Sequence, residues 1–343
     1  MNETLLARVP SPPHPTAAHG RPAVAAWLLV CAALVAAMVV VGGITRLTHS
    51  GLSIVEWQPL VGTLPPLAEG DWQALFDKYR QTPQYRVVNR GMSLDEFKGI
   101  FWWEYVHRLL GRAIGLVFIV PLAWFWWRGR IDRALGWKLV GVFALGGLQG
   151  ALGWYMVASG LVDEPGVSQL RLAAHLGLAF LILGALVWIG LDLLHPRRRG
   201  APAPARLATA VAGLVFVQVL AGALVAGLRA GKAYNTFPLM NGHLVPPETF
   251  MLEPWWRNFV NNMATVQLDH RLLAWLLLFL VPWLWLRVRR SGASRPARLG
   301  ADTLLGLVAL QFGLGVATLL AAVPVALAAA HQGVATLVFA AAL

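Results

Sequence analysis

Long runs of apolar residues, separated by polar segments, dominate this chain. A helix of about 20 apolar residues is long enough to cross a lipid bilayer. The pattern therefore predicts eight membrane-spanning helices, of which the last is the shortest. Their expected bounds are roughly 23–45, 104–127, 137–158, 171–194, 207–229, 266–287, 301–323 and 326–343.

The composition agrees with this pattern, because 57% of the residues are hydrophobic and only 13% are charged. We therefore expect an all-α polytopic membrane protein embedded in a lipid bilayer. The single cysteine, Cys31, falls inside the first apolar run. The long polar segments 46–103 and 230–265 consequently contain no disulfide or thiol pair, so any redox chemistry must use another group.

The net charge of +12 is concentrated in alternate short loops, at 128–138, 197–206 and 287–298. Basic loops remain on the cytoplasmic side of a membrane. We therefore expect both termini, including a tail of residues 1–22, to lie in the cytoplasm. The charge is interpreted as a topology signal and not as a nucleic-acid-binding surface.

The two halves of the chain resemble each other. EYVHRLLGR at 104–112 returns as QLDHRLLAW at 267–275, and LQGALG at 148–153 returns as LQFGLG at 310–315. Because four spans bring the chain back to its starting side, the second copy inserts in the same orientation as the first. The sequence therefore predicts two pseudo-symmetric four-helix bundles related as a parallel repeat. The predicted halves are residues 23–200 and 201–343.

Four histidines lie within the even-numbered spans, near the ends expected to face outside: His107, His175, His270 and His331. Ionisable groups inside a membrane are costly and usually functional. Two inward imidazoles at equal depth in a four-helix bundle suit bis-imidazole ligation of haem. One haem site in each half is therefore expected; the alternative is that such a histidine bonds one helix to another.

Three arginines near these histidines are candidate partners for haem propionates. Arg108 and Arg271 each follow a histidine, and Arg171 lies one turn outward of His175. The alternative for all three is simple snorkelling of a long side chain to the membrane interface. Other site types fit less well, because the paired-histidine motifs of di-iron enzymes are missing and unbroken helices do not suggest a transporter.

The ordered motifs GGITRLTHSGLSIVEWQPLVGTLPP, ExxHRLLGR, LAAHLG, NTFPLM, LDHRLL and a last AHQ cover about residues 25–343. Together they resemble the haem A synthase family, in the form found in alphaproteobacteria and mitochondria. The other bacterial form of this family carries paired cysteines in its outer loops, which this chain lacks.

This resemblance implies an oxidoreductase that oxidises the C8 methyl group of haem O to a formyl group, giving haem A for terminal oxidases. It implies haem b as cofactor in the second half, with His270 and His331 as axial ligands to its iron, and the substrate haem near His107 and His175. Haem O synthase is the implied partner, and an unidentified electron-transfer partner is required. A non-enzymatic carrier with two haems b is the alternative, because it explains the histidines equally well.

Glu104 is the candidate catalytic residue of the first half. It lies three residues before His107, on the same helix face, whereas the second half has Gln267 at the matching position. Glutamine cannot take a proton or carry charge, so the acid is expected only where chemistry occurs. The alternative is that Glu104 simply forms an ion pair with Arg108, four residues later.

The segment 71–100 in the first outer loop is amphipathic enough to form short helices. We expect these helices to cover the first site as a lid that excludes water from the substrate. The alternative is a solvated connector.

Overall fold

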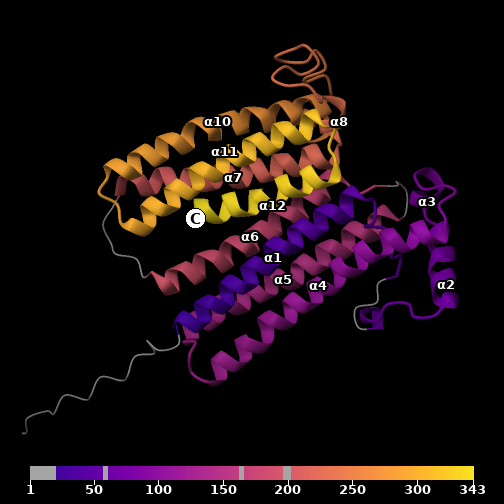
Figure 1. Ribbon diagram of the computed structural model, residues 1–343, viewed down its shortest axis with the longest axis horizontal. Coiled ribbons are helices and arrows are strands. Elements are labelled where there is room, and N and C mark those ends of the chain that lie inside the picture. Colours follow the sequence, from indigo (N-terminus) through magenta and orange to yellow (C-terminus); the bar gives the residue numbers. More distant parts are fainter. Residues whose placement is uncertain (1–20, 57–60, 162–165, 196–201) are drawn as a thin grey trace, which may run out of the picture.

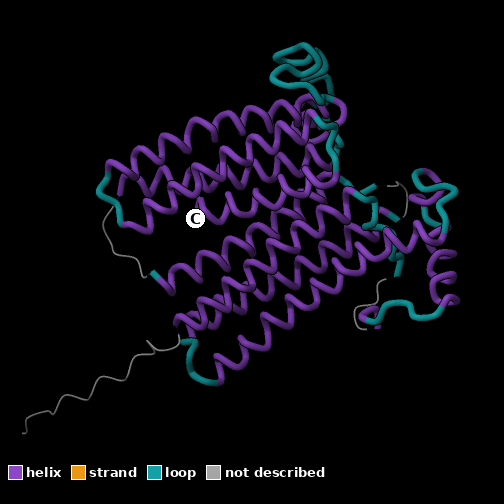
Figure 2. Tube along the Cα trace, viewed as in Figure 1, coloured by secondary structure: helices purple, strands orange, loops and turns teal. Residues whose placement is uncertain are grey.

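The computed structural model describes residues 21–56, 61–161, 166–195 and 202–343, and within these ranges every regular element is a helix (Figure 2). Eight helices in the described ranges are long and apolar enough to cross a membrane, which confirms the predicted fold class. They are α1 (Arg21–Leu47), α4 (Leu94–Trp127), α5 (Arg133–Gly160), α6 (Gln169–Leu194), α7 (Pro202–Gly227), α10 (Met263–Arg290), α11 (Arg295–Leu320) and α12 (Val325–Ala342). Residues 1–20 of the expected tail and the basic residues 197–199 lie outside the described residues.

The start of the second span differs from the sequence prediction: α4 begins at Leu94, not at residue 104. A capping box fixes this start, because the Ser93 backbone N–H donates to Glu96 Oε2 (2.8 Å) and the Glu96 N–H donates to Ser93 Oγ (3.3 Å). As a consequence, His107 lies more than three turns into its helix. His175, His270 and His331 lie about two turns into theirs.

The spans of the two halves pack in the same order. In the first half α1 contacts α4 and α6, and α5 contacts α4 and α6; in the second half α7 contacts α10 and α12, and α11 contacts α10 and α12. The halves meet where α1 packs on α12 and α7 packs on α6. This order is the one that a parallel repeat requires, and the repeat itself stays a prediction.

The apolar core lies along these central helices. Leu28 of α1, Leu186 of α6 and Val211 of α7 are almost completely buried within it. The outer helices α5 and α11 instead expose large apolar side chains along much of their length, such as Phe143 and Leu310. A surface of this kind is stable only against lipid, which agrees with a membrane-embedded bundle.

The two long loops gather at one end of the bundle, and the loops between α4 and α5 and between α10 and α11 lie at the other (Figure 1). This is the segregation that the charge pattern predicts. The first long loop contains η2 (Val61–Thr63), α2 (Glu69–Arg80) and α3 (Pro83–Val87), and the second contains α8 (Ala230–Ala233), η3 (Trp255–Arg257) and α9 (Asn258–Asn261).

The first long loop has a small core of its own against the outward extension of α4. Trp72, Phe76 and Tyr79 of α2 are buried against Phe97 and Phe101 of α4. The Trp72 and Phe101 rings meet edge to face, with centroids 4.9 Å apart. The predicted short helices are therefore present, although residues 94–100 belong to the spanning helix α4.

Candidate functional site

Each of the four predicted histidines lies against a glycine of a neighbouring helix. A Cβ placed on Gly42 of α1 would lie 3.0 Å from Nε2 of His107 in α4. The other pairs are His175 with Gly153 of α5, His270 with Gly222 of α7 and His331 with Gly315 of α11, each with a ring carbon 3.0 to 3.1 Å from the same point. Any side chain larger than hydrogen would therefore press on an imidazole at all four contacts.

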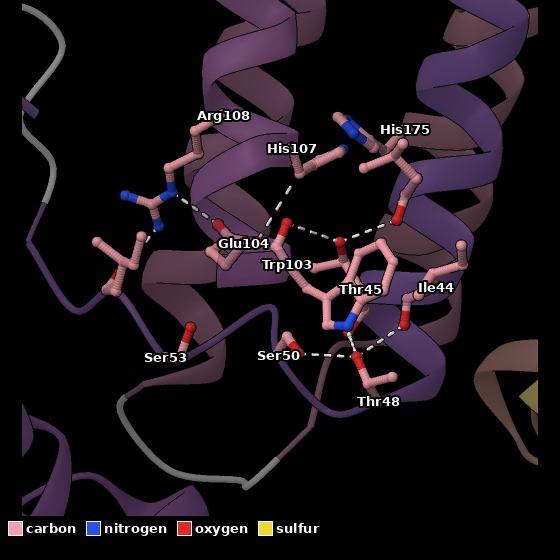
Figure 3. A network of polar contacts seen from close by, with 12 residues as sticks. Ile44, Thr45, Thr48, Ser50, Ser53, Trp103, Glu104, His107, Arg108 and His175 are labelled. Atoms are coloured by element: carbon pink, nitrogen blue, oxygen red, sulfur yellow. Dashed lines mark hydrogen bonds and ion pairs between the residues drawn. The ribbon is translucent and has the colours of Figure 1, made fainter. Parts of the chain in front are cut away.

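The imidazoles come together in two pairs, one in each half. His107 and His175 direct their rings toward each other in Figure 3. His270 and His331 occupy the matching positions on α10 and α12, which both pack on α7 and α11. The structure thus brings together the two residues predicted for each site, from helices that are not neighbours in sequence.

Buried ring nitrogens of these histidines are suited to serve as ligands to an iron atom. Nδ1 of His175, His270 and His331 is buried without a hydrogen-bond partner. A buried polar atom without a partner costs about 1–3 kcal/mol, so a bound group that uses it stabilises the site. Haem iron with two imidazole ligands takes one nitrogen from each, so His270 and His331 fit a haem in the second half, and His175 offers one such nitrogen in the first.

Three glutamines outside the sequence-predicted site contact the imidazoles. Nε2 of Gln149, Gln218 and Gln311 lies 3.3, 3.4 and 3.4 Å from Nε2 of His175, His270 and His331, respectively. Each glutamine precedes the contacting glycine by four residues, so both lie on one helix face. This Q-x-x-x-G spacing is readable in LQGALG and LQFGLG, where the glycines are most simply interpreted as helix-packing positions.

Glu104 is buried beside the first pair. Its Oε1 accepts a hydrogen bond from Arg108 Nε at 2.6 Å, and its Oε2 lies 3.9 Å from Nδ1 of His107 (Figure 3). The matching Gln267 is equally buried, since each residue is 3% exposed, and its Oε1 has no hydrogen-bond partner. The ion pair expected as the structural alternative is therefore present, and the carboxylate also faces the histidine.

Two of the predicted propionate partners hold the outer loops. Arg108 donates to the backbone carbonyls of Ile54 (2.9 Å) and Glu56 (3.1 Å). Arg271 donates to four carbonyls of the second loop, including those of Tyr234 (3.0 Å) and Thr236 (2.8 Å). Contact with a propionate stays a prediction for both arginines.

Arg171, the third candidate, is half-buried in the first turn of α6. Its guanidinium stacks over the ring of Tyr155, 4.9 Å from the centroid. Among the described residues, no group of three or more histidine, cysteine and acidic side chains is placed to hold a bare metal ion.

A polar network closes the outer side of the first pair. Thr45 Oγ1 donates to the carbonyl of Val41 (2.9 Å) and lies 3.3 Å from that of Trp103, which links α1 to α4 (Figure 3). Beyond it, the hydroxyls of Thr48 and Ser50 are 2.7 Å apart. The turn after α1 is thereby tied to the helix that carries Glu104 and His107.

The chain is similar to known proteins along most of its length. The family model described as cytochrome oxidase assembly protein (COX15-CtaA) matches residues 25–343. A haem A synthase of Nitrosospira multiformis is 62% identical over 325 residues, which cover 93% of this chain and 91% of that protein. Haem A synthases of Nitrosomonas eutropha (58% identical, covering 93% and 92%) and Parvibaculum lavamentivorans (52%, covering 92% and 91%) are similar along the same length.

Proposed function

Since the chain belongs to the haem A synthase family of cytochrome oxidase assembly proteins, we propose that it oxidises the C8 methyl group of haem O to the formyl group of haem A. It is a multi-pass membrane enzyme of haem A biosynthesis. The formyl group contains an oxygen atom that the methyl group lacks, and with water as its source the reaction releases protons and electrons. It therefore needs a group that accepts protons and a partner that accepts electrons.

The observation that carries this proposal is the difference between two otherwise similar histidine pairs. The pair in the first half has a buried carboxylate, Glu104, 3.9 Å from His107, whereas the second half has the amide of Gln267 at the matching position. An amide keeps the shape of the carboxylate but neither holds nor releases a proton. The first half is therefore assigned the substrate haem, and the second half the resident cofactor.

The resident cofactor is assigned as haem b, with His270 and His331 as the ligands to its iron. Both imidazoles carry a buried ring nitrogen without a protein partner, and both are seated on glycines. When bound there, haem b supplies one-electron transfer. His107 and His175 hold the substrate haem in the same manner in the first half.

Glu104 has two tasks in this scheme. Its carboxylate takes protons released from the substrate and stabilises positive charge that develops beside the porphyrin. Arg108 fixes the carboxylate at 2.6 Å and is itself anchored to the loop carbonyls of Ile54 and Glu56. The acid is therefore held in one position while it faces His107.

A carrier with two haems b is the second candidate. It would need two equivalent electron-transfer sites, and it has no use for one buried acid in one half. The relatives named above are all haem A synthases, so the comparisons do not favour the carrier.

The surroundings follow from the same proposal. The enzyme lies in the bacterial inner membrane, with both termini cytoplasmic and both haem sites near the outer face, as the basic loops indicate. Haem O is very hydrophobic, so direct transfer from haem O synthase is the expected route of supply. A separate electron-transfer partner accepts the electrons.

Analysis of the pigments in the purified protein tests the proposed function. The synthase should contain haem b together with haem O or haem A, and it should convert added haem O to haem A when an electron acceptor is present. Two equivalents of haem b, with no haem O or haem A under any supply, would support the carrier and overturn the synthase.

A further inference from the structure

Four residues before each glycine that contacts a histidine stands a side chain on the same helix face. Three of these side chains are glutamines and one is not. Gln149, Gln218 and Gln311 occupy this position before Gly153, Gly222 and Gly315, but Met38 occupies it before Gly42. Met38 lies against α4, since its Cε would be 3.0 Å from a Cβ placed on Gly111, one turn inward of His107. His107 is therefore the one member of the four without an amide on the facing helix.

A second exchange accompanies the first. Around His270 both neighbours are amides, Gln218 on the facing helix and Gln267 on its own helix. At the corresponding positions around His107 stand Met38, on the facing helix, and Glu104, whose carboxylate lies 3.9 Å from Nδ1 of the ring. Compared with the second half, the first half has a thioether in place of an amide on the facing helix. It also has a carboxylate in place of an amide on the histidine's own helix.

The chemistry of these groups predicts how firmly each ring is held. A glutamine amide carries both donors and an acceptor, so it pairs with an imidazole nitrogen in either protonation state, whereas a thioether is only a weak acceptor. Gln149 and Gln218 also donate to the backbone carbonyls of His175 and His270, each at 3.1 Å. These two amides are consequently fixed to the helix whose histidine they contact.

We propose that Gln149, Gln218 and Gln311 are positioning residues that fix three of the four imidazoles from the facing helix, and that Met38 leaves His107 held by Glu104 alone. This inference rests on the proposed function, because it assumes that each pair binds a haem. It gives the two sites different character: the resident haem has two fixed ligands, whereas the substrate haem has a fixed ligand, His175, and a mobile one, His107.

A site with one mobile ligand suits an occupant that must be exchanged. A group that orients an iron-binding histidine changes the affinity of the site for the metal by about 10- to 100-fold. Removal of that group at one ligand therefore speeds release of the product without weakening the resident haem in the other half.

Reciprocal substitutions in the full-length protein test this proposal. Met38→Gln adds the missing amide, and Met38→Leu is the matched control that keeps an apolar side chain. The protein is loaded with haem O, and its release is followed by transfer of haem to an excess of apomyoglobin. We expect Met38→Gln to slow release about tenfold and Met38→Leu to leave the rate within about twofold of the unsubstituted protein.

Gln218→Met makes the opposite change in the second half. We expect haem b to remain bound through His270 and His331, with shifted or broadened g values in the electron paramagnetic resonance spectrum of the ferric low-spin haem and faster transfer to apomyoglobin. Met38→Gln should leave that spectrum unchanged.

Two outcomes would overturn the inference at different levels. If unsubstituted protein holds both haems, but Met38→Gln releases haem O as fast as Met38→Leu and Gln218→Met leaves the spectrum unchanged, the positioning roles are wrong and the proposed function stands. If unsubstituted protein holds no haem, the proposed function fails and this inference fails with it.

Discussion

Gly222 of α7 and His270 of α10 are in such close contact that a methyl group on Gly222 would lie 3.1 Å from Cε1 of the imidazole. The contact recurs at Gly42, Gly153 and Gly315 with the other three histidines. A helix pair can hold a ring at this depth only if one helix presents no side chain. The glycines are therefore part of the sites and not only of the helix packing.

Gly222→Ala is expected to lower the occupancy of haem b. The added methyl group displaces the His270 ring, and a displaced ligand binds iron about tenfold more weakly or worse. Alanine favours a helix by about 1 kcal/mol over glycine, so α7 itself gains stability. Gly213→Ala in the same helix is the control, because a Cβ on Gly213 has open space around it. Equal haem b per protein in both variants would show that the contact is unimportant.

The two histidine pairs are expected to respond differently to substitution. His270→Ala or His331→Ala should remove haem b and its low-spin spectrum, because one lost imidazole leaves an open coordination position on the iron. His107→Ala or His175→Ala should retain most haem b and abolish haem A formation. Absorption spectra and extracted pigments measure both effects. Equal loss of haem b in all four variants would contradict the division between halves.

The first outer loop is expected to act as a lid. Leu75 and Lys78 of α2 line a small cavity together with Tyr105 and Arg108 of α4. Phe76→Ala should loosen α2 by about 3–5 kcal/mol, the usual effect of removing a buried aromatic ring, with haem b retained and haem A production lost. Leu67→Ala, at an exposed position of the same loop, is the control. Unchanged turnover in Phe76→Ala would make the loop a connector.

Tyr79 makes the stability of this loop dependent on pH. Burial raises the pKa of its phenol, which donates to Gln84 Oε1 (3.2 Å) and accepts from Asn89 Nδ2 (2.7 Å). Because the folded-state pKa lies above the unfolded value of about 10, the contribution is complete below pH 10 and is lost as the pH rises through the folded-state pKa. The protection factors of the α2 amides, which correct hydrogen exchange for its intrinsic rise with pH, should therefore fall above pH 10. Tyr79→Phe should remove this fall and cost about 1 kcal/mol at neutral pH.

The spans and their histidines were predictable because apolar length and periodic polar positions determine how a helix lies in lipid. The start of α4 was not predicted from apolar length, since residues 94–103 mix charged and aromatic side chains. The Ser93–Glu96 capping box was the signal that marked it. The length of an apolar run indicates how much of a helix lies within the membrane. A capping motif indicates where a helix that extends beyond the membrane ends.

The surroundings of the histidines were less predictable. Arg108 and Arg271 adjoin histidines in sequence, but successive residues of a helix do not point the same way. The sequence therefore did not reveal that both arginines donate to loop carbonyls. The contacts of Gln149 and Gln311 depend on which helices are neighbours in space. A repeated Q-x-x-x-G spacing in one chain does not reveal the facing helix.

The pigments bound to Glu104→Gln, purified from cells that supply haem O, test the account most directly. Glutamine stands at the matching position in the second half, so the variant is expected to fold and to bind haem b. It cannot accept a proton, so the account predicts haem b with haem O or a partly oxidised haem, and little haem A. Haem A at the level of the unsubstituted protein would contradict the account and would leave Glu104 as a structural partner of Arg108.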